Sequence, residues 1–203
     1  MHDEPGRPVG PADGVRGRRP RTTRARLAEV ALRLFARDGF EATTVDDIAD
    51  AAGIARRTFF RYYATKADVV WGEFDAELER LRERFRRAPE GLPIVDVVRT
   101  AVVATNRFGA GELDQLRTRI ELTATVPALV AHSAVQYQAW CDVVAEFAAR
   151  RLGADPGELG PQTVARACLG AALAAFTVWA ARPDEDLDRC LDEAFQILAA
   201  GCA

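Results

Sequence analysis

Apolar residues recur at intervals of three and four along most of the chain, which is the spacing of one face of an α-helix. The pattern predicts helices over residues 22–38, 44–52 and 55–62. A long fourth helix is predicted to begin at the cap Thr65, because a regular apolar stripe follows it. The members of this stripe are Val70, Phe74, Leu78, Leu81 and Phe85.

Five further helices are predicted in the rest of the chain, and strand patterns are almost absent after residue 21. Three of these helices open at a proline, which suits the first turn of a helix because its N–H group has no partner there. The pattern therefore predicts an all-α protein. The five segments are 93–108, 113–125, 127–152, 161–181 and 187–200.

Charge is distributed unevenly, although the net charge is only −3. Residues 1–63 carry 12 arginines against 9 acidic residues, whereas the remainder carries 15 basic and 21 acidic residues. A basic end on an acidic body predicts contact with phosphate at one end. Residues 1–21 are rich in Gly and Pro and are predicted to be disordered. Their arginines form either a solvated tail or an arm that reaches DNA; these are Arg16, Arg18, Arg19 and Arg21.

Several classes of protein are not favoured by the composition. The four cysteines are too far apart for a metal knuckle or a redox pair, and the two histidines are isolated, so neither a metal site nor a cofactor is expected. No apolar run is expected to reach the length of a membrane helix, and a signal peptide is not apparent. We therefore expect a cytoplasmic protein without a membrane partner. Because nucleophile elbows, phosphate loops and dinucleotide fingerprints are absent from the sequence, an enzyme is not expected.

Residues 44–66 have the pattern of a helix-turn-helix. Thr44 is predicted to cap the first of the two helices, and Gly53 to form the turn, where it can adopt a positive φ angle. Ile54 and Phe59 are predicted to hold the second helix against its neighbours. The side chains left on its outer face are Arg56, Arg57, Thr58, Phe60 and Arg61.

This outer face offers donors for guanine edges and phosphates, which a DNA recognition helix requires. A solvated basic helix in an ordinary bundle is the alternative interpretation. The ordered combination of cap, turn glycine, inward apolar residues and the aromatic run over residues 59–63 favours DNA binding instead.

These motifs resemble the DNA-binding domain of the TetR family over residues 24–71. The resemblance implies an N-terminal helix-turn-helix domain over residues 22–65 and a C-terminal effector-binding and dimerisation domain over residues 66–203. It places Arg56, Arg57, Thr58 and Phe60 in the major groove, and Thr44, Tyr62 and Lys66 on phosphates. Two departures are visible, because Ala64-Thr65 replaces the frequent Pro-Ser, and Phe60 replaces a frequent Tyr.

Residues 55–62 and 71–81 are also similar to TetR-type regulators of mycofactocin biosynthesis. This narrower resemblance covers residues 24–85 and implies a repressor of mycofactocin genes that a small effector releases. The alternative within the family is a repressor of an efflux or lipid-metabolism operon with a different apolar ligand. An activator with the same fold and a non-specific architectural DNA protein are further alternatives.

Large apolar residues on the body helices are expected either to pack in the core or to line an effector cavity between helices. A basic residue at the cavity mouth would suit an anionic head group, and the family resemblance implies a long-chain acyl-CoA as one possible effector. The last two helices, over about 161–200, are expected to pair with those of a second subunit. The candidate effector residues are Trp71, Phe74, Phe108, Arg119, Trp140, Phe147 and Trp179, with Arg107 and Arg117 as further cations.

Overall fold

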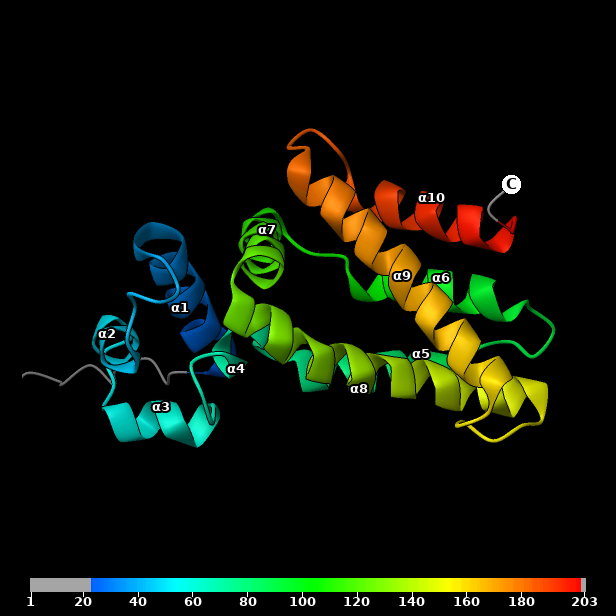
Figure 1. Ribbon diagram of the computed structural model, residues 1–203, viewed down its shortest axis with the longest axis horizontal. Coiled ribbons are helices and arrows are strands. Elements are labelled where there is room, and N and C mark those ends of the chain that lie inside the picture. Colours follow the sequence, from blue (N-terminus) through cyan, green and yellow to red (C-terminus); the bar gives the residue numbers. More distant parts are fainter. Residues whose placement is uncertain (1–22, 202–203) are drawn as a thin grey trace, which may run out of the picture.

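The computed structural model describes residues 23–201, and every regular element within that range is an α-helix (Figure 1). The arginine arm predicted over residues 1–21 lies outside the described residues. Figure 1 places α1 to α3 at one end of the molecule and α5 to α10 at the other. The bounds of the first group are Arg24–Asp38 for α1, Val45–Ala51 for α2 and Arg56–Tyr62 for α3.

The predicted long fourth helix is wrong, because the chain forms two helices there. The short α4 spans Asp68–Trp71 and α5 spans Phe74–Arg86. Between them Gly72 has φ 59° and ψ −114°, a conformation that only glycine adopts readily. The apolar stripe continues in register across the break, so its spacing alone does not reveal the glycine kink.

The remaining helices follow the predicted segments closely. α6 spans Ile94–Thr105, α7 spans Ala110–Thr125 and α8 spans Pro127–Leu152. α9 begins two residues earlier than predicted, at Leu159, and ends at Ala181, while α10 spans Leu187–Ala199. In Figure 1 the long α8 runs along the body and α9 crosses it. In this view α6 and α10 lie above α8.

Two hydrophobic clusters divide the buried residues. The first joins α1 to α3 with the apolar residues of α4, and it also includes Leu122 from α7 and Leu129 from α8. The second lies among α5 to α10 and includes Val98, Phe147 and Leu191. Because α4 packs with the N-terminal helices while Leu122 and Leu129 reach them from the body, the junction between the two ends is itself packed.

The helix α9 is long and apolar enough to cross a membrane by length and composition alone. The expectation that no segment approaches this length is therefore wrong, because it counted uninterrupted apolar runs and α9 contains scattered small and polar residues. Only 28% of its most apolar stretch is buried within the chain. Gly170, Ala174 and Val178 lie on its exposed side.

The cysteines in the described range are free thiols, and Cys141 and Cys168 are fully buried. Burial raises the pKa of Cys168 to about 12, which keeps the thiol protonated at neutral pH. Both buried thiols therefore pack as small hydrophobic side chains. Cys190 is half-buried, and Cys202 lies outside the described residues.

Candidate DNA interface and inner cavity

The start of α2 is fixed by a reciprocal cap. The Thr44 Oγ1 accepts a hydrogen bond from the Asp47 backbone N–H at 3.1 Å, and the Thr44 backbone N–H donates to the Asp47 carboxylate at 2.8 Å. The Thr44 hydroxyl also donates to that carboxylate at 2.6 Å. These bonds from Thr44 hold the pKa of Asp47 below its ordinary value, so the cap stays charged at neutral pH.

The turn before α3 matches the sequence prediction. Gly53 has φ 67°, and the Ile54 backbone N–H donates to the Ala49 carbonyl at 2.9 Å. The side chain of Phe59 is fully buried, and its ring packs against Phe60 with a centroid distance of 5.4 Å and against Tyr63 at 5.9 Å. The inward side of α3 is therefore anchored by Phe59.

The outward side of α3 carries its arginines in solvent, as predicted. Arg56, Arg57 and Arg61 are exposed, and Phe60 is 44% exposed, whereas Thr58 and Tyr62 are half-buried. Three guanidinium groups on one short exposed face form a surface that suits nucleic-acid phosphates and base edges.

Two of these arginines already have neighbours on the same surface. Arg56 pairs with Asp46 of α2 at 2.6 Å and lies 5.4 Å from the centre of the Phe60 ring. The guanidinium of Arg61 lies 5.2 Å from the Tyr62 ring. Within residues 23–201 no carboxylate pairs with Arg57. Because the Arg56–Asp46 pair is solvent-exposed, it is worth at most about 1 kcal/mol and can be exchanged for a phosphate or a base.

Lys66 ties the start of α4 to the loop before α2. Its Nζ donates to the Phe40 carbonyl at 2.6 Å and to the Thr43 carbonyl at 2.9 Å, and it lies 4.2 Å from the centre of the Phe40 ring. This structural role was not predicted from the sequence. An ammonium has one further N–H group, so a phosphate contact by Lys66 stays a prediction.

Tyr63 connects α3 to the joint between the two ends of the molecule. Its hydroxyl donates to the Arg24 carbonyl at 2.9 Å and lies 3.3 Å from the Gly72 carbonyl, and its side chain is 2% exposed. Burial raises the pKa of this hydroxyl, which keeps it a donor at neutral pH. The sequence pattern indicated Tyr63 only as part of the aromatic run over residues 59–63, although its place four residues after Phe59 puts it on the same inward face.

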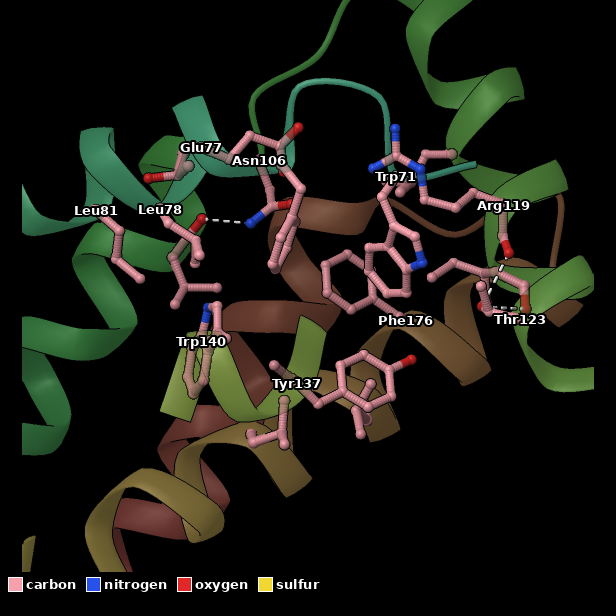
Figure 2. A pocket seen from close by; sticks show the side chains of 18 of the residues that line it. Trp71, Glu77, Leu78, Leu81, Asn106, Arg119, Thr123, Tyr137, Trp140 and Phe176 are labelled. Carbon is pink, nitrogen blue, oxygen red and sulfur yellow. Dashed lines mark hydrogen bonds between the residues drawn. The ribbon is translucent and has the colours of Figure 1, made fainter. Parts of the chain in front are cut away.

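A cavity of about 100 Å³ lies between the body helices, next to this joint (Figure 2). Its wall combines side chains from α5, α6, α7, α8 and α9 with Trp71, the last residue of α4. Five of the predicted effector residues are brought together there: Trp71, Phe74, Phe108, Arg119 and Trp140.

Phe147 and Trp179 do not line the cavity. Phe147 lies two turns beyond Trp140 on the same face of α8, about 11 Å along the helix, and stacks on Phe85 with a centroid distance of 4.4 Å. Trp179 is 1% exposed and lies under the guanidinium of Arg117 at 4.0 Å. Both are core residues, so the structure separates them from the site.

The two other candidate cations also lie elsewhere. Arg117 donates to carbonyls at the end of α9, with the shortest bond to the Trp179 carbonyl at 2.6 Å. Arg107 is exposed and approaches Asp188 of α10 at 3.4 Å. Of the three arginines considered for an anionic group, only Arg119 therefore faces the cavity.

Polar residues of the wall were missed from the sequence. Asn106 donates to the Val102 carbonyl at 2.9 Å, and Thr123 donates to the Arg119 carbonyl at 2.9 Å, so both bond within their own helix. Burial raises the pKa of Tyr137, whose ring packs on Trp71 at 5.7 Å. Polar helix positions of this kind look like solvent-facing positions in a sequence, and only the fold brings them to one cavity.

Two family descriptions match the chain. The model of the bacterial regulatory proteins of the TetR family matches residues 27–70, and that of the MftR C-terminal domain matches residues 92–203. The first match covers the helix-turn-helix and α4 up to its penultimate residue. The second covers α6 to α10, which contribute most of the cavity wall.

Whole-length relatives agree with these matches. The chain is 40% identical over 185 residues to a Mycobacterium tuberculosis protein, MftR, whose name assigns it to regulation of mycofactocin biosynthesis; the match covers 91% of this chain and 93% of that protein. It is 30% identical to the transcriptional regulator TcmR of Streptomyces glaucescens, covering 93% and 85%. The crystal structure of the Thermus thermophilus repressor FadR with lauroyl-CoA is similar with a TM-score of 0.59 and 27% identity, covering 89% and 95%.

Proposed function

The chain belongs to the TetR family of bacterial transcriptional regulators, and we propose from this premise that it is a dimeric repressor released from operator DNA by a small effector. One observation carries the proposal: Trp71 lines the cavity and also packs in the hydrophobic cluster of the DNA-binding helices. A ligand in the cavity therefore touches the segment that positions α3.

The proposed DNA contacts follow from the exposed face of α3. Arg56, Arg57 and Phe60 enter the major groove together with Thr58, while Thr44, Tyr62 and Lys66 approach phosphates. In a dimer, two copies of α3 meet successive major grooves about 34–36 Å apart. Release requires only a modest coupling free energy between cavity and DNA, about 1–3 kcal/mol.

The proposed dimer forms through α9 and α10, over about residues 161–200. Its support is the exposed small-residue side of α9 together with Ile197 of α10, which is 52% exposed. Phe195 of α10 is fully buried within the chain and cannot contribute area to this interface.

A bulky residue at Gly170 tests this dimer. An added Cβ at Gly170 meets no atom within 4 Å in one chain, so Gly170→Arg is expected to leave the fold intact and produce monomers in analytical ultracentrifugation. The control is Gly111→Arg on α7, where a Cβ also meets nothing within 4 Å. A Gly170→Arg protein that remains a dimer would contradict the proposed interface.

The regulated genes are proposed to be those of mycofactocin biosynthesis. The support is the 40% identity to MftR across 91% of this chain and the match of residues 92–203 to the MftR C-terminal domain. Deleting the gene for this protein is expected to raise transcripts of the mycofactocin genes, measured by RNA sequencing. A fall would indicate an activator, and unchanged transcripts would contradict the assignment.

The proposed effector is apolar, and a long-chain acyl-CoA is one candidate. The support is the apolar wall and the similarity to FadR, whose structure contains lauroyl-CoA. A cavity of about 100 Å³ is smaller than the roughly 150 Å³ that holds benzene, so an acyl chain must part the helices as it enters. Lauroyl-CoA, but not CoA alone, is expected to lower the anisotropy of a labelled operator; no change at saturation would exclude it.

A further inference from the structure

Two N–H groups in the cavity wall have no acceptor among residues 23–201. The Trp71 Nε1 and the Arg119 Nε are both buried and without a hydrogen-bond partner. Trp71 as a whole is 7% exposed. Buried donors in proteins are nearly always paired, so two unpaired donors in one cavity wall indicate an acceptor that is supplied from outside the chain.

The other short polar side chains of the wall are already engaged. Thr123, Asn106 and Thr105 each donate to a backbone carbonyl three or four residues earlier in their own helix. The rest of the wall is largely apolar. Tyr137 also lines the wall, and its hydroxyl interacts with Ser133 and Thr123. Among the described residues of the wall, Trp71 Nε1 and Arg119 Nε are therefore the buried donors left to orient a ligand.

The charges of the wall are separated. Arg119 lies beside Trp71 at one end of the cavity, and Glu77 lies with Asn106 at the other (Figure 2). Within residues 23–201 no carboxylate pairs with Arg119. An anionic group is therefore favoured at the Trp71–Arg119 end and disfavoured near Glu77.

The same end of the cavity lies against the joint of the fold. A Cβ placed on Gly72 would lie 3.5 Å from Arg119 Nη2 and 3.5 Å from the Cβ of Ala28 on α1. The Gly72 carbonyl in turn lies 3.3 Å from the Tyr63 hydroxyl. A group bound by Trp71 and Arg119 thus acts directly on the segment that connects α1 and α3 to the body.

We propose that the effector is an apolar molecule with a carboxylate, whose oxygens accept hydrogen bonds from Trp71 Nε1 and the Arg119 guanidinium beside the Gly72 kink. The inference rests on the proposed function and specifies the ligand class of its cavity. An arginine fork and an indole N–H match the planar, multiply accepting carboxylate, and bonds to a charged acceptor are the strong ones.

Matched pairs of probes test the inference by isothermal titration calorimetry at neutral pH. The first pair is 2-naphthoate and 2-naphthylmethanol, and the second is laurate and 1-dodecanol, so that each pair differs only in the polar group. At least one carboxylate is expected to bind about tenfold or more tightly than its alcohol. Equal binding within both pairs, or no carboxylate binding at about 1 mM, overturns the inference.

Variants test whether Trp71 and Arg119 cause the preference for carboxylates over alcohols. Arg119→Gln is expected to bring the ratio of carboxylate affinity to alcohol affinity close to one. Trp71→Phe keeps a ring but removes the N–H, and it is expected to lower this ratio several-fold. Trp140→Phe is expected to affect both members of a pair equally, and Arg107→Gln, outside the cavity, to leave the ratio unchanged. A preference that survives Arg119→Gln contradicts the inference.

The design separates this inference from the proposed function. If operator DNA is released by lauroyl-CoA while carboxylates show no preference over alcohols, the carboxylate inference fails and the repressor proposal stands. If carboxylates bind as expected but no duplex is bound specifically, the ligand class stands and the repressor proposal fails.

Discussion

The exposed face of α3 and the wall of the cavity differ in the hydrogen-bond partners available to their polar groups. On α3 the guanidinium groups of Arg56 and Arg57 lie in solvent, where water can satisfy them, and Arg56 also pairs with Asp46. In the cavity Trp71 Nε1 and Arg119 Nε are buried without acceptors from residues 23–201, and each such group costs about 1–3 kcal/mol. The exposed face of α3 can therefore change with little effect on the fold, whereas the cavity carries a penalty that the proposed ligand would remove.

The largest expected contrast lies between two adjacent phenylalanines of α3. Phe59→Ala is expected to destabilise the protein by about 3–5 kcal/mol, because Phe59 is fully buried. Phe60→Ala should change the stability by no more than about 0.5 kcal/mol, because Phe60 is 44% exposed. Urea denaturation followed by circular dichroism measures both. Equal destabilisation would mean that the outer face of α3 is also structural.

The next largest effect is expected at the joint between the two regions. Gly72→Ala should destabilise the protein by about 1–3 kcal/mol, because alanine rarely adopts φ 59° with ψ −114°. The nearest atoms to the added Cβ lie at 3.5 Å, so backbone strain rather than a clash is the cause. The control is Gly111→Ala near the start of α7, outside the proposed dimer interface, where an added Cβ meets no atom within 4 Å; it should stabilise by up to about 1 kcal/mol. If Gly72→Ala leaves the stability unchanged, the backbone conformation at Gly72 does not constrain the joint.

The two regions also differ in how far the sequence predicted them. Thr44, Gly53 and Phe59 lie within one short segment of the chain. A cap, a turn and a buried ring at fixed spacing leave few alternative structures for α2 and α3. The helix over Pro127–Leu152 was likewise predicted to the residue, because a proline opens it and a glycine ends it.

The cavity could be predicted only in part. Large apolar residues pointed to Trp71, Phe108 and Trp140, but the same criterion also selected Phe147 and Trp179, because side-chain size does not tell a cavity wall from a packed core. The Gly72 kink was hidden by an apolar stripe that continues through it. The unpaired state of Trp71 Nε1 depends on every neighbouring helix, so no local pattern could reveal it.

The smallest expected effect concerns the ion pair on the DNA-binding surface. Asp46→Asn is expected to strengthen operator binding by at most about 1 kcal/mol, because it frees Arg56 from a solvent-exposed pair at 2.6 Å. Asp50→Asn, which removes the same charge from an exposed position of α2, serves as the control. Fluorescence anisotropy with labelled operator measures both. An equal gain for the two variants would indicate general electrostatics rather than release of Arg56.

The most direct test of sequence-specific DNA binding by α3 compares two affinities at physiological salt. Fluorescence anisotropy should show the protein binding one palindromic duplex upstream of the mycofactocin genes at least about 10³-fold more tightly than a scrambled duplex. Arg57→Ala should reduce operator affinity by about 1–3 kcal/mol and relax base preference at one position, with unchanged thermal stability. Equal affinity for both duplexes, or an Arg57→Ala protein that binds the operator like the parent, would contradict it.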